Sequence, residues 1–209
     1  GYHRSAVAKE GVLSTSFVRR NGRRLAAWTL AIGLSALILI VGFWTGVIER
    51  RFIYFPEARL DADPSSVGLT FDEASFVASD GVRLHGWFVP GPRDVTMLWF
   101  HGNAGNISHR LDNLALVHDR LGVSVLLFDY RGYGRSAATP SEAGTYRDAE
   151  AALGYMRDRG DIAMDRVVYF GRSPGAAVAV ETALRQPPLG LILESPFPSI
   201  PDMARRVYP

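Results

Sequence analysis

The chain of 209 residues is long enough for one or two domains, and its hydrophobic content of 47% is ordinary for a folded protein. It contains no cysteine, which excludes disulfides and thiolate metal sites. Basic residues are concentrated before residue 52, where the net charge is +6, whereas residues 52–209 carry a net charge of −4. A nucleic-acid-binding domain would show the opposite distribution, so we expect no nucleic-acid partner.

An uncharged apolar run covers residues 25–48. As a helix it would span roughly 36 Å, enough to cross a hydrocarbon core of about 30 Å. Trp28 and Trp44 lie near its ends, where aromatic rings favour the membrane interface. A cleavable signal peptide is the alternative, but no small-x-small cleavage site follows the run. We therefore expect an uncleaved transmembrane anchor with the lipid bilayer as its partner.

Charges beside the apolar run predict its orientation. More Lys and Arg residues precede the run, in the basic tail 1–24, than follow it closely. The positive-inside rule then places the N-terminus in the cytoplasm and the rest of the chain on the extracytoplasmic side. The stretch 49–69 contains Pro56 and Pro64 and is interpreted as a juxtamembrane linker.

Residues 70–209 alternate between predicted strands and helices, which is typical of an α/β domain. The first two strands alternate apolar and polar residues around "SDG" and predict an antiparallel pair. The later apolar runs predict a mostly parallel sheet with helices on both faces. The predicted strands are Ala74–Ala78, Arg83–Val89, Thr96–Phe100, Ser124–Phe128, Val167–Phe170 and Leu189–Leu193; the predicted helices are Ile107–Leu121, Ser141–Arg159, Gly175–Arg185 and one from about Ile200.

The sequence "GRSPG", Gly171–Gly175, fits the G-x-S-x-G pattern. Its context matches that pattern's mechanical role, because a strand precedes it and a helix follows, so a sharp turn would expose the Ser173 hydroxyl. Gly171 and Gly175 would let the strand and helix approach that turn. Ser173 could instead cap the helix, since Ser is a good N-cap and Pro is favoured at the first helical position. We favour the nucleophile.

A second motif, "HGNAGN", follows the third predicted strand. Acyl transfer needs donors aimed at the developing oxyanion, and the loop after the third strand commonly supplies one from its backbone. The Asn103 N–H is our candidate, with Ala104 next. We do not interpret His101 as a metal ligand, because no second ligand lies at suitable spacing on the same element, and we expect no metal and no cofactor.

The motif "FDYRGYGRS" follows the fourth predicted strand and contains G-x-G. A third glycine at the dinucleotide-binding spacing is missing, so we interpret the motif as a loop at the same sheet edge as Ser173. Asp129 could be structural, pairing with Arg131 or another arginine. Glu194, after the sixth strand, is interpreted as a structural carboxylate.

The ordered motifs "RFIYFP", "HGNAGN", "DYRGYGRS", "GRSPGAAVA" and "ESPFPSIPDMA", behind the apolar run, resemble membrane-anchored α/β-hydrolases. These include fungal bud-emergence proteins, their bacterial relatives, and animal lysophospholipid and protein-depalmitoylating hydrolases. The resemblance implies an α/β-hydrolase fold, a nucleophile at Ser173 and an oxyanion donor near Asn103. It also implies small-molecule ester or thioester substrates of lipid character.

Two departures from the family pattern stand out. The residue after the nucleophile normally supplies the second oxyanion N–H, and Pro174 has none. The chain order in this fold is Ser, then an acid, then His, yet no His follows Ser173. We therefore expect the last strands and the catalytic acid and His to lie beyond Pro209, and this chain by itself to be nearly inactive. A non-catalytic hydrolase-like protein that binds a lipid or protein partner is the alternative.

Overall fold

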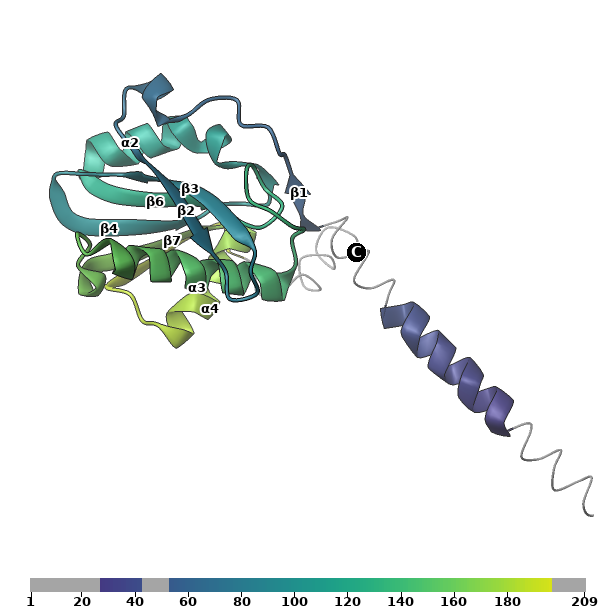
Figure 1. Ribbon diagram of the computed structural model, residues 1–209. Helices are drawn as coiled ribbons and strands as arrows, with labels where there is room; N and C mark the ends of the chain where they lie inside the picture. Colours follow the sequence, from purple (N-terminus) through teal and green to yellow (C-terminus); the bar gives the residue numbers. More distant parts are fainter. Residues whose placement is uncertain (1–26, 43–52, 197–209) are drawn as a thin grey trace, which may run out of the picture. The chain divides into compact units, whose positions relative to one another are not determined.

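The computed structural model of the protein describes residues 27–42 and 53–196 (Figure 1). The chain divides into two units, Gly1–Ile48 and Glu49–Pro209. In the first unit, residues 27–42 are helical and exposed throughout. No helix within the described ranges has both the length and the apolar character needed to cross a membrane. Residues 25–26 and 43–48 of the predicted anchor lie outside the described residues, as does the predicted last helix.

A six-stranded sheet forms the centre of the second unit. It consists of β2 (Asp72–Val77), β3 (Arg83–Val89), β4 (Arg93–Phe100), β6 (Val123–Asp129), β7 (Val167–Arg172) and β8 (Gly190–Glu194). The strand order is β2-β3-β6-β4-β7-β8. β3 is antiparallel to both neighbours, whereas β6, β4, β7 and β8 are mutually parallel. The predicted antiparallel pair and the mostly parallel sheet are both confirmed.

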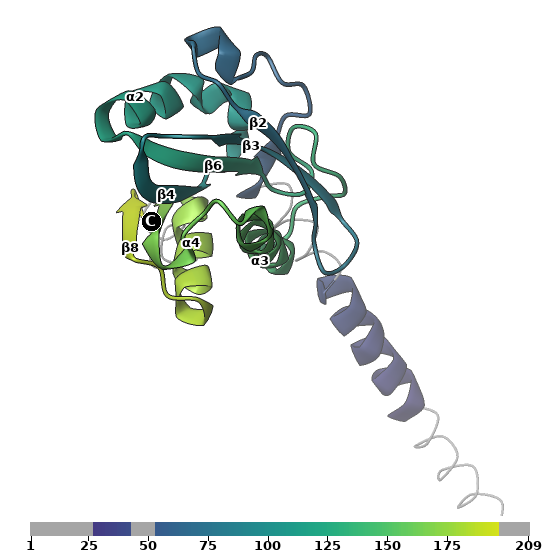
Figure 2. The same ribbon diagram turned by 60° about the vertical axis from the view of Figure 1, so that its left-hand side comes forward.

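Helices cover both faces of this sheet (Figures 1 and 2). α2 (Leu111–Leu121), which follows the 3₁₀ helix η2 (Ile107–Arg110), lies on one face, and α3 (Glu142–Arg159) and α4 (Pro174–Arg185) lie on the other. Two further 3₁₀ turns are η1 (Pro64–Val67) and η3 (Met164–Arg166). The Ser141 hydroxyl accepts the Gly144 N–H at the start of α3, and Gly160 ends that helix at φ 73°. The three predicted helices within the described residues are confirmed.

Residues 97–100 of β4 and 125–128 of β6 are all apolar, because both faces of the sheet are buried there. In β4, Leu98 and Phe100 pack toward α3 and α4, whereas Trp99 packs toward α2. β6 alternates in the same way, with Phe128 on the first side and Leu127 on the second. Because β4, β6 and β7 are parallel, their carboxyl ends lie at one sheet edge, where the loops that carry the chemistry begin.

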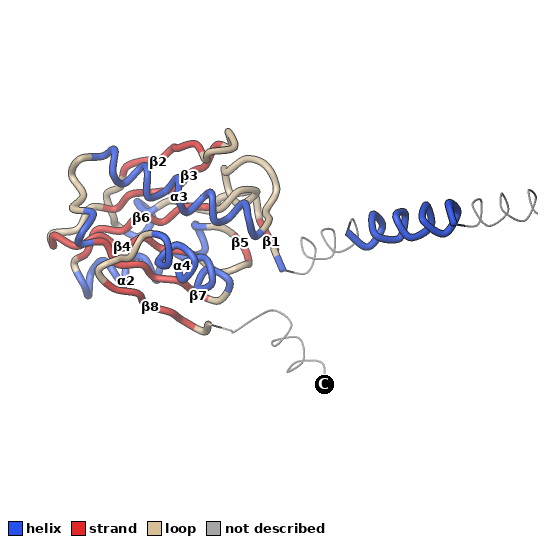
Figure 3. Tube along the Cα trace, turned by 90° about the horizontal axis from the view of Figure 1, so that it is seen from below, coloured by secondary structure: helices blue, strands red, loops and turns tan. Residues whose placement is uncertain are grey.

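A second, two-stranded sheet lies at that edge. β1 (Phe55–Pro56) pairs in parallel with β5 (Ala104–Gly105), and Figure 3 shows the two strands side by side. The described part of the predicted linker, residues 53–69, is therefore hydrogen-bonded to the domain rather than a free connection. The sequence concealed this pairing, because β1 is only two residues long and both of its residues are exposed.

Candidate functional site

Ser173 stands on a sharp turn between β7 and α4. Its backbone has φ 54° and ψ −122°, a left-handed conformation that only three non-glycine residues adopt in the described ranges. Such a conformation is strained for a residue with a side chain, and it persists only where the surroundings enforce it. The strand-to-helix turn matches the geometry that exposes a nucleophilic hydroxyl above a sheet. Ser173 is half-buried, and no side-chain hydrogen bond caps α4 at this residue.

The glycines on either side of Ser173 permit the close approaches that enforce this turn. A Cβ on Gly171 would lie 2.6 Å from the Gly175 carbonyl oxygen and 2.6 Å from Ala176 Cα. A Cβ on Gly175 would collide with the carbonyl oxygens of Phe100 and His101, at the end of β4. α4 therefore starts directly against the end of β4, which brings Ser173 beside the loop that follows β4.

Strand register brings this loop and Ser173 to the same edge. β4 and β7 are paired up to Phe100 and Gly171, so the residues that follow each strand emerge together. A Cβ on Gly102 would touch the Arg172 carbonyl oxygen at 3.8 Å. Asn103 and Ala104, the candidate oxyanion donors, come next in this loop.

Hydrogen bonds from three other segments hold the loop. The Asn103 carbonyl accepts the Phe55 N–H at 3.0 Å and the Tyr133 hydroxyl at 2.7 Å. The Asn103 side-chain amide donates to the Ile53 carbonyl at 3.0 Å. The Arg110 guanidinium donates to the Ala104 carbonyl. The two bonds to the Asn103 carbonyl orient the Asn103–Ala104 peptide, whose N–H is that of Ala104, one of the two candidate donors.

A buried acid and imidazole lie beneath the loop. Asp129 Oδ1 accepts the Ile107 N–H at 2.9 Å and lies 3.7 Å from His101 Nε2, and both side chains are completely buried. Burial raises the pKa of Asp129 to about 8 and lowers the pKa of His101 to about 3, so both groups are neutral at pH 7. His101 Nδ1 lies 2.7 Å from the Gly102 carbonyl oxygen, which requires that nitrogen to carry the proton.

Two arginines lie close to the candidate site: Arg172 directly precedes Ser173, and Arg110 binds the Ala104 carbonyl. Burial and the neighbouring Arg172 both lower the pKa of Arg110. Arg172 Nε lies 3.5 Å from the Glu194 carboxylate, and the Glu194 backbone carbonyl accepts the Ser173 N–H at 2.9 Å. Glu194 thus holds the turn through its backbone carbonyl, while its carboxylate pairs with Arg172.

The suggested pairing of Asp129 with Arg131 is wrong. Arg131 binds Asp80 and Asp148 instead, each at 2.8 Å, and Asp148 is fully buried. The chain turns directly after β6, so the Asp129 side chain points toward the loop after β4, whereas Arg131 reaches α3 and the β2–β3 turn.

The described residues supply Ser173 with a turn and a neighbouring loop, but not with a base. None of the hydrogen bonds within residues 53–196 joins the Ser173 hydroxyl to a histidine. His85 is paired with Asp129 at the end of β6, but its ring contacts Glu73, and His118 contacts the Pro90 carbonyl. No group of three His, Asp or Glu side chains in the described ranges is arranged to bind a metal.

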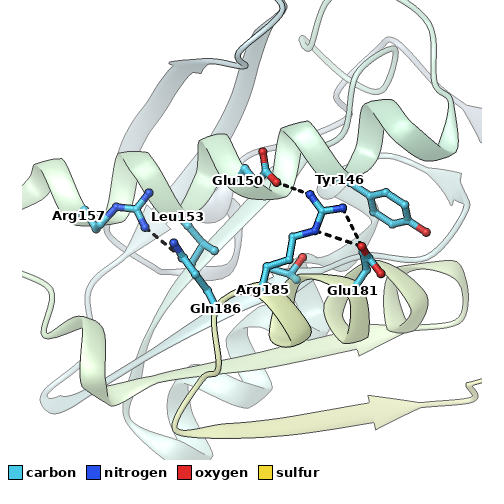
Figure 4. A pocket seen from close by; sticks show the side chains of 8 residues that line it. Tyr146, Glu150, Leu153, Arg157, Glu181, Arg185 and Gln186 are labelled. Atoms are coloured by element: carbon cyan, nitrogen blue, oxygen red, sulfur yellow. Dashed lines mark hydrogen bonds and ion pairs between the residues drawn. The ribbon is translucent and has the colours of Figure 1, made fainter.

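A pocket of about 280 Å³ lies between α3 and α4 (Figure 4). Its lining residues are Tyr146, Glu150, Leu153, Arg157, Glu181, Thr182, Arg185 and Gln186. Arg185 crosses it and pairs with Glu150 and Glu181, each at 2.7 Å. The lining residues on α4 belong to its C-terminal half, roughly 15 Å along the helix from Ser173 at 1.5 Å per residue, so the pocket is separate from the candidate site.

Comparison of the sequence with known proteins identifies the family of this chain. The family model for serine aminopeptidase S33 matches residues 91–208. Protein bem46 of Schizosaccharomyces pombe is 42% identical over 87% of this chain, and the alpha/beta hydrolase domain-containing protein WAV2 of Arabidopsis thaliana is 37% identical over 85%. The chain belongs to the α/β-hydrolase family, in the group of bem46. An uncharacterized protein of Mycobacterium tuberculosis is 41% identical over 85% of the chain.

The chain spans about three fifths of these three relatives: 62%, 59% and 63% of their respective lengths. The solved structure of an esterase from Pyrococcus furiosus superposes with a TM-score of 0.63 at 21% identity, covering 75% of this chain and 60% of the esterase. An α/β-hydrolase from Vibrio vulnificus superposes with a TM-score of 0.56 at 25% identity, covering 65% of this chain and 48% of that protein. The resemblance in fold and the family are thus both established.

Two contributions to the site could not be found from the sequence. Tyr133 lies in the glycine-containing loop that was expected at this edge, but its hydrogen bond to Asn103 carries no local sequence signal. Phe55 belongs to the stretch interpreted as a linker. Arg172 is different, because it directly precedes Ser173 in the chain and its place near the site could be predicted from the sequence.

Proposed function

We propose that the whole protein is a serine hydrolase that cleaves carboxylic ester or thioester bonds through an acyl-enzyme on Ser173. The supporting observation is the strained backbone of Ser173 between β7 and α4, with glycines at the close approaches on both sides. A serine that served only as a helix cap would need neither the positive φ nor those contacts.

In the proposed reaction, Ser173 Oγ attacks the substrate carbonyl carbon and gives its proton to a base. The carbonyl oxygen becomes an oxyanion that accepts hydrogen bonds from the Asn103 N–H, with Ala104 as the neighbouring donor. Collapse of the tetrahedral intermediate breaks the ester or thioester bond, and the alcohol or thiol leaves with a proton. Water then hydrolyses the acyl-enzyme. The base comes from outside the described residues, since no described histidine contacts Ser173.

Pro174 reduces the number of donors at this oxyanion. The position after the nucleophile usually supplies an N–H, and proline has none. Loss of one donor costs about 3 kcal/mol of transition-state stabilisation, or roughly a hundredfold in rate. We therefore propose slow turnover. The first amide that α4 can offer belongs to Gly175.

Labelling of the whole protein with a fluorophosphonate probe tests the proposal. Covalent modification should occur at Ser173, identified by peptide mass, and should be absent from Ser173→Ala. Hydrolysis of acyl esters of increasing chain length then defines the acyl preference, for which lipid-like substrates are proposed. Absence of modification, in a protein shown to be folded by circular dichroism, would rule out the enzyme.

A non-catalytic binding protein is the second candidate, and Pro174 is the observation that favours it. Such a protein would keep the fold and bind a lipid or partner without turning it over. It would resist the probe at Ser173 and would still show saturable binding of a fatty acid or lysolipid by calorimetry.

We also propose that residues 25–48 anchor the protein in a lipid bilayer, with the N-terminus cytoplasmic and the hydrolase domain extracytoplasmic. The supporting features are the apolar run, its helical residues 27–42 and the excess of basic residues before it. These 209 residues contain no cysteine, so once any cysteine elsewhere in the whole protein is replaced, a single introduced cysteine reports its own side of the membrane. In sealed spheroplasts an impermeant maleimide should label Ser66→Cys but not Ser5→Cys. The reverse labelling pattern would overturn the proposed orientation. Release of the protein from membranes by alkaline carbonate would overturn the anchor.

A further inference from the structure

The segment that enters the hydrolase domain, residues 53–57, lies against the candidate oxyanion loop. The Phe55 N–H donates to the Asn103 carbonyl at 3.0 Å, and the Glu57 N–H donates to the Gly105 carbonyl at 3.1 Å. The Asn103 side chain returns a hydrogen bond to the Ile53 carbonyl. The contact is thus made backbone to backbone at successive alternate residues, as in a parallel strand pair.

The same segment also contacts the loop after β6. The Gly134 N–H donates to the Glu57 carbonyl at 2.9 Å, and the neighbouring Tyr133 hydroxyl donates to the Asn103 carbonyl. Burial raises the pKa of Tyr133 above its usual range, so this hydroxyl keeps its proton and remains a donor. Residues 53–57 and Tyr133 therefore hold the Asn103 carbonyl, and so the Asn103–Ala104 peptide, from two directions.

A fully buried asparagine extends this attachment. The Asn106 side-chain amide donates to the carbonyls of Glu57 and Arg59, at 3.0 and 2.6 Å, while its Oδ1 accepts the Ser108 N–H at 2.9 Å. A short loop rich in small residues has few side chains of its own with which to fix its backbone. Here the fixing groups come from a segment about 50 positions earlier in the chain.

We propose that residues 53–57 are a positioning strand of the active site, which holds the Asn103–Ala104 peptide, and with it the Ala104 N–H, in the orientation that an oxyanion donor requires. The inference rests on the proposed hydrolase function. Oxyanion donors act by preorganisation, so a peptide free to rotate would retain substrate binding but lose transition-state stabilisation. A fragment that begins after residue 58 would then keep the main sheet and lose activity.

The decisive variant is Phe55→Pro in the whole protein, because proline removes the N–H that holds the Asn103 carbonyl and leaves the strand extended. Tyr133→Phe removes the second donor to the same carbonyl and leaves the ring in place. Ala58→Pro is the matched control, since Ala58 is exposed and its N–H makes no hydrogen bond to another described residue.

Two measurements follow each variant. Hydrogen exchange by mass spectrometry should show faster exchange of the amides of residues 102–106 in Phe55→Pro and Tyr133→Phe, and unchanged exchange in Ala58→Pro. Ester hydrolysis should show kcat lowered about tenfold in Phe55→Pro, with KM within about twofold of the wild type, because the lost interaction acts in the transition state. Ala58→Pro should keep the wild-type kcat.

The outcomes separate the two proposals. A wild-type protein that the fluorophosphonate probe does not modify would refute the hydrolase function. Suppose instead that the probe modifies the wild-type protein. If Phe55→Pro then has the same kcat as the wild type, or unchanged hydrogen exchange in residues 102–106, the positioning role is overturned and the hydrolase function still stands. Equal losses in kcat for Phe55→Pro and Ala58→Pro would overturn it as well.

Discussion

The buried Asp129 carboxyl predicts an unusual dependence of folding stability on pH. Its pKa is raised by burial to about 8 in the folded protein, whereas an aspartate in an unfolded chain has a pKa of about 3.9. Between these values the folded protein holds a proton that the unfolded chain releases. This group therefore lowers the stability of the folded state as pH rises from about 4, and its effect levels off above about pH 8.

Asp129→Asn removes this dependence and keeps the geometry. The asparagine side-chain oxygen can accept the Ile107 N–H that Asp129 Oδ1 accepts at 2.9 Å, and the amide is neutral at every pH. Between pH 4 and pH 8, each rise of one pH unit lowers the free energy of unfolding of the wild type by about 1.4 kcal/mol. The loss is smaller near pH 8, where the folded carboxyl begins to ionise. The stability of Asp129→Asn relative to the wild type should rise by about 3 to 4 kcal/mol between pH 5 and pH 8.

Urea unfolding at pH 5, 6, 7 and 8 measures this difference, followed by the fluorescence of the buried Trp87 and Trp99. His101 acts in the opposite direction: burial lowers its pKa to about 3, so its contribution is lost as pH falls below about 6.5. That contribution is common to both proteins and cancels in the difference. Two stability curves that run parallel from pH 5 to pH 8 would show that Asp129 is already ionised in the folded state and would refute the reasoning.

Three further substitutions test the turn at Ser173 and the ion pairs of Arg131. Pro174→Leu restores an N–H beside the nucleophile, so the whole protein should hydrolyse esters about a hundredfold faster; an unchanged kcat would mean that another amide already serves the oxyanion. Gly175→Ala places a methyl group against the carbonyls at the end of β4 and should lower the free energy of unfolding by about 3 kcal/mol, measured in urea, whereas wild-type stability would contradict the close approach. Arg131→Lys cannot bind both Asp80 and the buried Asp148 with a planar fork, and a loss of about 3 kcal/mol is expected. Because Arg131 lowers the pKa of Asp80 to about 2, acid unfolding below pH 4 should also be less steep in this variant, as a titration from pH 5 to pH 2 would show.

The sequence was sufficient for the strands of the main sheet, three helices and the Ser173 turn, because each of these depends on residues close together in the chain. The apolar runs of β4 and β6 indicate burial on both faces, and the period-2 pattern around the "SDG" turn indicates the β2–β3 hairpin. Gly171, Ser173 and Gly175 lie within five residues, and their strand-to-helix context is equally local. A strand, a turn and a helix are encoded by the spacing of side chains along one segment.

Tertiary structure alone decided what holds the loop beside Ser173. Asn103 and Ile53 are hydrogen-bonded although they are 50 positions apart, and the bond involves a backbone carbonyl that every residue possesses. Asp129 is the last residue of β6, a position that a surface residue could also occupy, and only the packing of η2 against it shows that the acid is buried and neutral. Backbone pairing and burial depend on which segments meet in space, and no local pattern of side chains specifies that meeting.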